Sequence, residues 1–242
     1  LIEDTCESIG AMYGSKFAGT FGLFASLSMY QSHHISSIEG GLILTSDNYY
    51  ADLLRSMRAN GWLREITQKK IKQKLVNKNK SIDPSFMFPF IGFNFKPTDM
   101  SAALVNNQIN KLSYFIKKRK YAAERLIDGL QEFNKYMILP KKKVLNVKNS
   151  WFTFPLVIKK NNKFQKSAIT SYLKSHGIAN RPIIAGNIAE QPFIRDFKHR
   201  KGDLKNSKIV MRNGFFIGLN HKLNDKNILY IIRIFKNFFK NL

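Results

Sequence analysis

Several polar residues near the start of the chain have types and spacings that could support proton-transfer chemistry. Asp4 ends the opening LIED, an apolar pair followed by two carboxylates, where a strand would end, and Glu7 lies three positions further on. A histidine pair, His33 and His34, follows five residues after Ser28. An imidazole ordinarily titrates near a pKa of about 6.5 and can act as a general base. A carboxylate can stabilise a neighbouring cation. These residue types therefore predict acid–base chemistry.

Each of these features also has an ordinary structural explanation. A carboxylate at a strand end is often a cap or a solvated charge. A glycine pair such as Gly40-Gly41 is typical of a turn, and buried histidines are often structural. His176, His199 and His221 are scattered without the spacing of metal ligands, so no metal site is expected.

The composition limits the class of protein. The 242 residues are 44% hydrophobic and 23% charged, which excludes a disordered tail and a collagen-like fibre. The single cysteine, Cys6, excludes an internal disulfide framework, a four-cysteine zinc site and a protein-held iron–sulfur cluster. It favours a reducing, cytoplasmic compartment. No apolar run reaches about 18 residues, so no membrane span is expected.

The formal net charge of +24 raises the question of an anionic partner. Dense positive charge attracts nucleic acid because binding releases counterions from the phosphate backbone. However, the chain has 30 lysines and only 10 arginines, and arginine is the residue that reads bases and grips phosphate with two hydrogen bonds. A lysine excess is also typical of proteins from AT-rich genomes. We therefore expect no nucleic-acid partner, and expect the charge to help attract an anionic small substrate.

The elements that must position these residues alternate between strands and helices, which indicates α/β architecture. We expect strands over residues 42–45, 151–158 and 178–184, and helices over residues 50–58, 113–133, 164–176, 206–212 and 225–239, with one more beginning near residue 98. Asp47 is the expected N-cap of the first helix, and Asn60-Gly61 its end. The Lys-rich residues 65–84 are expected to form an exposed polar excursion. A break near residues 112–120 divides the chain.

Longer stretches of the sequence resemble one family. EDTCESIGAMYGSKFAGTFG, SLSMYQSHHISSIEGGLILTSD, IGFNFKPTDMSAALVNNQINKL, SWFTFPLVIK and HGIANRPIIAGNIAEQPF are similar, in this order, to the DegT-type sugar aminotransferases. The resemblance implies the pyridoxal-phosphate-dependent transferase fold type I, which is aspartate-aminotransferase-like. It identifies residues 1–112 as the remainder of the large cofactor-binding domain and residues 113–242 as a small C-terminal α/β domain.

Full-length relatives have a substantial region before the matching point. Since the chain opens on LIED without an initiator methionine, we expect it to be the C-terminal portion of a longer protein. The loop that cradles the cofactor phosphate would lie in the preceding region.

The resemblance implies roles around pyridoxal 5'-phosphate or pyridoxamine 5'-phosphate. The residue matching Asp4 lies beside the pyridine nitrogen and keeps it protonated. Ser28 matches a serine that contacts the phosphate, and Asn94 an asparagine that reaches the phosphate of the partner subunit in a homodimer. Glu7 matches a glutamate near the cofactor in one branch. A turn cap at Asn94 and a helix-start carboxylate at Glu7 remain the alternatives.

The informative departure from the family is at residue 33. Aminotransferases of this family have a lysine there, five residues after the serine, and it forms a Schiff base with the cofactor. His33 cannot form a lasting imine but can act as a general base. A histidine at this site, followed by His34 and then by Glu39-Gly40-Gly41, resembles the 3-dehydratase branch. Its members act on GDP- or CDP-linked 4-keto-6-deoxyhexoses.

The branch implies a reaction and its partners. The amine form of the cofactor condenses with the 4-keto group of a nucleotide sugar, His33 moves the proton, and the hydroxyl at sugar carbon 3 is lost. L-Glutamate then regenerates the amine in the branch without an iron–sulfur cluster. Because residues 65–84 replace the four-cysteine segment of the cluster-dependent relatives, no cluster is expected here.

Substrate contacts are expected from three further residues. His34 would shape the site, and Arg181 and Asn187 would contact the substrate or the glutamate carboxylate. An ordinary surface role remains the alternative for Arg181. Two other functions stay open, which are a nucleotide-sugar aminotransferase and a catalytically silent, truncated or scaffold-like homologue.

Overall fold

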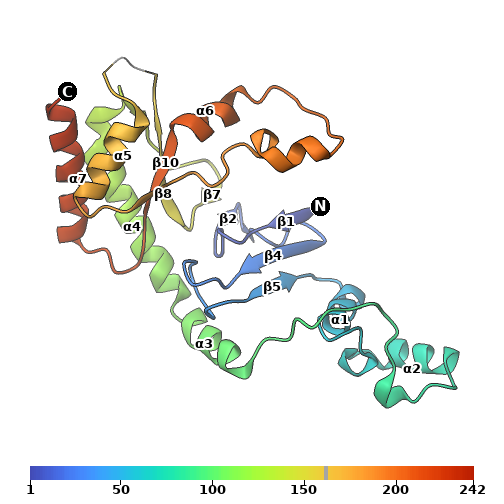
Figure 1. The fold of residues 1–242 in the computed structure, drawn as a ribbon. Coiled ribbons are helices and arrows are strands. Elements are labelled where there is room, and N and C mark those ends of the chain that lie inside the picture. Colours follow the sequence, from blue (N-terminus) through green and yellow to red (C-terminus); the bar gives the residue numbers. More distant parts are fainter. Residues whose placement is uncertain (161–162) are drawn as a thin grey trace. The chain divides into compact units, whose positions relative to one another are not determined.

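A computed structural model describes residues 1–160 and 163–242, and the chain divides into two compact units (Figure 1). Unit 1 comprises Leu1–Leu112 and unit 2 comprises Ser113–Leu242. Each unit has a sheet of its own, so each can be understood from its own residues.

The sheet of unit 1 joins the start of the chain to the segment before the histidine pair. Strand β1 (Ile2–Asp4) pairs in parallel with β4 (Phe24–Ser28), and β4 pairs antiparallel with β5 (Gly41–Leu44). The hairpin of β2 (Met12–Tyr13) and β3 (Lys16–Phe17) lies in the connection between β1 and β4. Because β1 and β4 are parallel, their carboxyl ends meet at one edge of the sheet, and this edge presents Asp4 beside Ser26.

A carboxylate fixes the turn that leads into β4. The side chain of Glu3 accepts hydrogen bonds from the backbone N–H groups of Gly19, Phe21 and Gly22 at 2.8, 2.7 and 2.7 Å. The bond from Gly19 is the main cause that lowers the pKa of Glu3. Glu3 is therefore a structural carboxylate that ties residues 19–22 to β1.

The first helix of unit 1 follows the capping signals of the sequence. Helix α1 (Asn48–Met57) begins after Asp47, whose carboxylate accepts from the backbone N–H groups of Tyr49 and Tyr50 at 2.8 and 3.1 Å. Beyond its end, Asn60 and Gly61 have φ angles of 62° and 81°. A side chain on Gly61 would also collide with the carbonyl of Phe90. The predicted start and end of this helix are confirmed.

The Lys-rich excursion contains a helix that the sequence analysis did not predict. After the 3-10 turn η1 (Leu63–Glu65), helix α2 (Lys69–Lys78) packs its apolar residues on a small cluster, and the turn η2 (Pro84–Phe86) follows. The cluster contains Leu63, Ile66 and Met87 at its centre. The apolar residues of this segment have the spacing of one face of a helix. The surrounding lysines made that pattern hard to recognise in the sequence. Helix α3 (Asp99–Ile109) then begins after the predicted cap Thr98.

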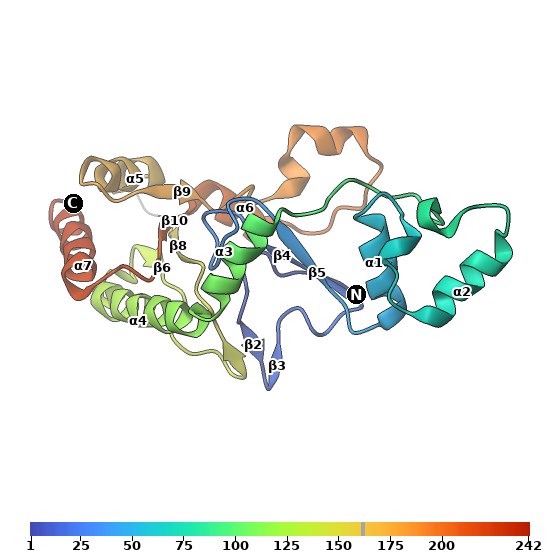
Figure 2. The same cartoon turned by 90° about the horizontal axis from the view of Figure 1, so that it is seen from below.

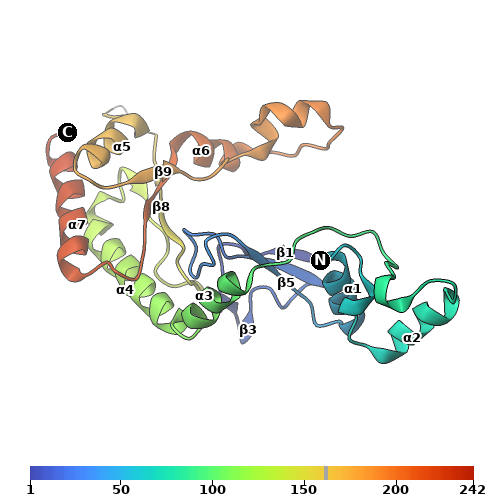
Figure 3. The same cartoon turned by 60° about the horizontal axis from the view of Figure 1, so that its bottom comes forward.

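Unit 2 is a sheet with helices along one side, as Figures 2 and 3 show. The sheet has the order β6-β8-β10-β9 and is antiparallel throughout. Its strands are β6 (Met137–Ile138), β8 (Thr153–Ile158), β10 (Gly214–Gly218) and β9 (Asn180–Pro182), and its main helices are α4 (Leu112–Leu130), α5 (Lys166–Ser175) and α7 (Asp225–Lys240). Alternate residues of β8, namely Phe154, Leu156 and Ile158, point into the core between these layers.

Shorter elements connect the layers of unit 2. They are η3 (Gln131–Phe133), β7 (Val147–Lys148), η4 (Ile188–Glu190), η5 (Pro192–Asp196) and helix α6 (Lys205–Asn213). Strand β10 was not predicted, because Asn213-Gly214 reads as the end of a helix and the strand begins at that same glycine. Of residues 178–184, only 180–182 form the strand β9. Among the described residues, no helix is long and apolar enough to cross a membrane.

Candidate active site

Asp4 lies at the end of β1 with its carboxylate oriented by its neighbours. The backbone N–H of Cys6 donates to Oδ1 at 3.1 Å, and the hydroxyl of Ser26 donates to the same oxygen at 3.4 Å. The Cys6 side chain, then the Cys6 backbone N–H and the Ser26 hydroxyl lower the pKa of Asp4. The carboxylate is therefore ionised at neutral pH and can stabilise a positive charge placed beside it.

The loop that carries the histidine pair is closed at its base by one buried residue. The backbone N–H of Met29 donates to the carbonyl of Gly40 at 2.9 Å, and the N–H of Ser37 donates to the carbonyl of Met29 at 2.9 Å. Met29 is itself buried. Ser28, directly before it, accepts a hydrogen bond from the backbone N–H of Tyr30 on its hydroxyl oxygen at 3.2 Å. The loop therefore starts and ends beside the carboxyl end of β4.

The two histidines of the loop differ in their surroundings. The backbone N–H of His33 donates to the carbonyl of Tyr30 at 3.0 Å, and the two rings meet edge to face with centroids 6.0 Å apart. His33 is partly exposed, whereas His34 is buried. His33 is thus the more exposed histidine of the pair, and His34 is enclosed by the protein.

Glu7 brings the carboxylate and the histidine into one site. Partial burial raises the pKa of Glu7, and the negative charge of Asp4 raises it further. The positive charge of a protonated His33 opposes both effects. Because each of these interactions falls off with distance, Glu7 lies within electrostatic reach of both Asp4 and His33. A proton acceptor and two carboxylates therefore share the edge of the unit 1 sheet.

The sequence analysis missed a residue that binds the backbone of the loop carrying the histidine pair. Gln108, in α3, accepts from the backbone N–H of Ser36 on Oε1 at 3.0 Å and donates from Nε2 to the carbonyl of Ser36 at 2.8 Å. The paired bonds fix residue 36 to a helix that follows 72 positions later. A side-chain amide in a polar stretch of a helix gave no sign of this contact.

The other predicted site residues belong to other segments of the chain. Asn94 is exposed, and its neighbours Phe93 and Phe95 form backbone hydrogen bonds with the end of α1. Arg181 is exposed on β9 of unit 2. Asn187 is buried, caps η4 by accepting from the N–H of Ala189 at 3.2 Å, and keeps a buried Nδ2 without a hydrogen-bond partner. No contact of these three residues assigns them a role in chemistry.

The histidine, cysteine and carboxylate side chains of residues 1–160 and 163–242 are dispersed. No group of three or more histidine, cysteine, aspartate or glutamate side chains there could hold a metal ion.

The comparisons with known proteins identify the family of the chain. Residues 1–236 match the model of the DegT/DnrJ/EryC1/StrS aminotransferase family. A GDP-4-keto-6-deoxy-D-mannose 3-dehydratase of Escherichia coli O55:H7 is 35% identical over 225 residues, which are 92% of this chain and 56% of the relative. The lipopolysaccharide biosynthesis protein RfbH of Salmonella typhimurium is 30% identical over 99% of this chain and 56% of its own length.

Solved structures give the same result for the fold. The E. coli GDP-4-keto-6-deoxy-D-mannose-3-dehydratase with bound hydrated pyridoxal phosphate is 32% identical, with a TM-score of 0.86, and the match covers 97% of this chain and 59% of that one. An aminotransferase from Psychrobacter cryohalolentis, 17% identical, shares the fold with a TM-score of 0.85. The predicted fold class, that of pyridoxal-phosphate-dependent aminotransferases, is confirmed.

The chain spans just over half the length of these relatives. The match to the family model nevertheless runs through both units, from the β1 carboxylate to helix α7. The chain belongs to the DegT/DnrJ/EryC1/StrS aminotransferase family.

Proposed function

We propose that the protein containing this chain is a pyridoxal-phosphate-dependent dehydratase of deoxysugar biosynthesis for surface polysaccharide. It removes the 3-hydroxyl of a nucleotide-linked 4-keto-6-deoxyhexose, with His33 in place of the Schiff-base lysine. The position of His33, five residues after Ser28 in a chain that matches this family over residues 1–236, carries the proposal. The similarity to the 3-dehydratase of E. coli and to the lipopolysaccharide biosynthesis protein of Salmonella supports it.

The residues of the site suit this cofactor in charge and hydrogen bonding. An ionised carboxylate at Asp4 suits a protonated pyridine nitrogen, and the hydroxyl of Ser28, at the same sheet edge, suits a phosphate oxygen. Asn94, exposed in unit 1, would reach the phosphate bound by the partner in a cytoplasmic homodimer. When bound, the cofactor supplies an electron sink for a carbanion at the neighbouring carbon.

The chain's own contribution to the reaction is proton transfer and charge placement. A ring nitrogen of His33 takes the proton from the carbon next to the cofactor ring, and then returns it to the oxygen that leaves sugar carbon 3. The carboxylate of Glu7 stabilises the imidazolium between these steps. Tyr30, edge to face with the imidazole, limits the directions in which that ring can turn.

Substrate binding is assigned to one residue of unit 1 and two of unit 2. His34, buried behind His33, would shape the pocket, while Arg181 and Asn187 of unit 2 would contact the nucleotide sugar or the carboxylate of L-glutamate. The free amide hydrogens of Asn187 Nδ2 suit an anionic oxygen. None of these roles involves nucleic acid or a membrane-spanning segment.

The deciding experiment is borohydride reduction of the full-length protein loaded with pyridoxal phosphate. We expect no cofactor–lysine adduct in the mass spectrum of the wild type, because an imidazole forms no lasting imine. The matched control is His33→Lys, which should trap an adduct on residue 33. A wild-type adduct on any lysine would contradict the proposal.

A second test isolates the proton transfer. His33→Asn keeps a polar side chain of smaller size but removes the base. Turnover should fall by about 10²–10⁴-fold, the usual contribution of a general base. Cofactor affinity, followed by absorbance, should change by less than about threefold. Solved relatives include a histidine-to-asparagine variant with GDP-perosamine bound, so such a replacement is compatible with folding and ligand binding in that protein. Full turnover by His33→Asn would remove His33 from this role.

An aminotransferase remains the second candidate, since GDP-perosamine synthase of Caulobacter vibrioides is 29% identical over half of this chain. Product analysis separates the two reactions. A dehydratase consumes L-glutamate and releases a 3-deoxy sugar, whereas a transaminase leaves a stable amino sugar. A protein that binds no cofactor at all would instead be the catalytically silent homologue.

A further inference from the structure

The segment around α2 concentrates positive charge in a way that the proposed reaction does not use. Between Ile66 and Ile82 the sequence has six lysines and no acidic residue. Five of the lysines, Lys69, Lys70, Lys74, Lys78 and Lys80, are exposed, and in the described chain none of the five is paired with a carboxylate. We call these five residues the lysine surface.

The packing of α2 fixes the direction in which the lysine surface points. Ile71, Leu75 and Val76 lie against the cluster of Leu63, Ile66 and Met87. The helix therefore buries its narrow apolar stripe in its own unit and turns its charged positions to solvent. A helix held by packing presents its lysines together, whereas a loop would disperse them.

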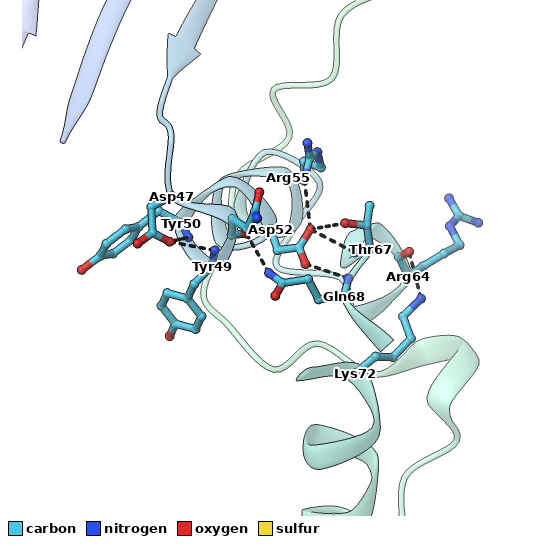
Figure 4. Close-up of polar contacts among 10 residues, drawn as sticks. Asp47, Tyr49, Tyr50, Asp52, Arg55, Arg64, Thr67, Gln68 and Lys72 are labelled. Carbon is cyan, nitrogen blue, oxygen red and sulfur yellow. Dashed lines mark hydrogen bonds and ion pairs between the residues drawn. The ribbon is translucent and has the colours of Figure 1, made fainter. Parts of the chain in front are cut away.

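A buried carboxylate anchors the beginning of α2 to α1, as Figure 4 shows. Asp52, 1% exposed, accepts from the backbone N–H and the hydroxyl of Thr67 at 3.0 and 2.8 Å and from the N–H of Gln68 at 2.9 Å. Arg55 completes the group with an ion pair at 3.0 Å. These bonds hold the residues directly before α2. The helix that carries most of the lysine surface is therefore fixed both at its beginning and along its apolar face.

Apolar side chains are exposed in the same segment. Ile82, Phe86 and Phe88 are 47%, 69% and 51% exposed. The two phenylalanine rings stack near Trp62 at centroid distances of 6.1 and 5.7 Å. The guanidinium of Arg64 lies 3.7 Å from the centroid of the same indole. The indole, the largest ring of the segment, is thus occupied by its neighbours and is not available to stack on a base.

We propose that the lysine surface, together with the exposed Ile82, Phe86 and Phe88 of the same segment, is a docking surface for an anionic phospholipid bilayer. Lysine ammonium groups on a convex helix face suit a diffuse sheet of negative charge better than a single phosphate, which favours arginine forks in a hollow. Exposed aromatic and aliphatic side chains suit the boundary between headgroups and acyl chains. The complementarity of charge and the adjoining apolar side chains distinguish a bilayer from an acidic protein, for which the apolar component is not required.

The experiment is co-sedimentation of the full-length protein with phosphatidylglycerol–phosphatidylcholine vesicles at about 0.1 M salt, where the Debye length is about 10 Å. The test variant combines Lys69→Gln, Lys70→Gln, Lys74→Gln and Lys78→Gln. We expect its partition coefficient to fall at least about tenfold, because each lysine near an anionic surface contributes separately. Vesicles of phosphatidylcholine alone should bind neither protein.

The matched control removes the same charge from unit 2, as Lys117→Gln, Lys141→Gln, Lys143→Gln and Lys174→Gln. None of these four lysines is paired with a carboxylate in the described chain. The control should lose less than about threefold in partition. Equal losses in both variants would show attraction by net charge alone and overturn the proposal. No binding by the wild type, or tighter binding of a duplex oligonucleotide through the same lysines, would also overturn it.

A separate variant tests the apolar component. Phe86→Ser changes no charge, and Phe86 is 69% exposed, so its replacement leaves the buried core intact. We expect partition to fall about threefold or more, while the thermal midpoint falls only by the small contribution of the lost stacking on Trp62. Unchanged partition would leave the surface purely electrostatic and contradict the apolar part of the proposal.

Discussion

At the scale of single residues, Asp52 has a measurable effect on acid stability. Its hydrogen bonds from Thr67 and Gln68 outweigh the opposing effect of burial and lower its pKa to about 2, against 3.8 in the absence of such contacts. A carboxyl whose pKa is depressed in the folded state contributes stability above its unfolded pKa and loses it as pH falls through the folded value. The two pKa values differ by nearly 2, which corresponds to about 2 kcal/mol of unfolding free energy.

Asp52→Asn should therefore destabilise the protein by about 2 kcal/mol at pH 7. The difference between variant and wild type should shrink as the pH falls from about 4 through about 2, because both side chains are then uncharged. Urea unfolding of both proteins at pH 7 and pH 3 measures this difference in unfolding free energy. Asp47→Asn, an exposed cap at the start of the same helix, is the control that should show a smaller loss. A pH-independent difference would show that geometry, not charge, dominates at Asp52.

Gln108 makes a second prediction at this scale, about the loop that carries His33. Gln108→Leu keeps the size of the side chain but leaves the backbone N–H and carbonyl of Ser36 without the partners seen here. We expect the amides of residues 30–40 to exchange with deuterium about tenfold faster or more, measured on peptides by mass spectrometry. Asn106→Leu, an exposed change in the same helix, should leave the exchange unaltered. Equal exchange in both variants would refute the tethering role.

The site residues differ in how far sequence could reveal them. Asp4, Ser28 and His33 follow from a family resemblance that covers their flanking motifs, and the structure adds that Glu7 responds to the charges of two of them. The contact of Gln108 with Ser36 spans 72 positions, and the thiol of Cys6 lies 3.5 Å from the hydroxyl of Ser26, 20 positions away. Contacts of this kind depend on the register of strands and helices, which no local pattern specifies.

At the scale of elements, local signals located helices better than strands. Asp47, Thr98 and Gly177 mark helix ends because caps act within one turn of the chain. Strand β10 has no such mark, because its five residues begin directly where α6 ends. Its place in the sheet comes from pairing with β8 and β9, which are distant in sequence. Sheet order therefore required the structure.

Helix α4 illustrates how one residue joins elements that are far apart in sequence. Arg119 is buried, and its Nη1 donates to the carbonyl groups of Trp151, Phe152 and Leu219 at 3.3, 2.8 and 2.6 Å. These carbonyls precede β8 and follow β10, so the guanidinium connects α4 to the ends of two central strands. Burial lowers the pKa of Arg119 to about 10, so the group still carries its charge at neutral pH.

Arg119→Met should destabilise unit 2 by about 3 kcal/mol, because the buried carbonyl groups would lose their donor. Arg119→Lys should lose less, since one ammonium group can still donate to some of them. Urea unfolding followed by the fluorescence of Trp151, in a Trp62→Phe background, measures both variants. Equal stability of the Met variant and the wild type would mean that burying the charge costs as much as its hydrogen bonds contribute.

At the scale of the whole molecule, the two units differ in how much core they contain. Unit 2 has one large cluster that includes the fully buried Phe154, Phe215 and Phe235, and Phe133 stacks on Phe239 at 4.4 Å. In unit 1, the cluster around Leu63 is small, and Ile2, Leu42 and Ile43 of its sheet are exposed. Burial of apolar area is the main source of folding free energy. The stability of the chain therefore resides mainly in unit 2.

Residues 113–242, expressed as a separate chain, should accordingly fold alone. We expect one cooperative urea transition with an m-value of about 1–3 kcal/mol/M, the range of small domains, followed by circular dichroism and by Trp151 fluorescence. The separate chain 1–112 should instead unfold over a broad range of urea and bind a hydrophobic dye, because the apolar side chains of Ile2, Leu42 and Ile43 in its sheet are exposed. A broad transition for residues 113–242 would contradict the assignment, since their core would then depend on contacts outside the unit.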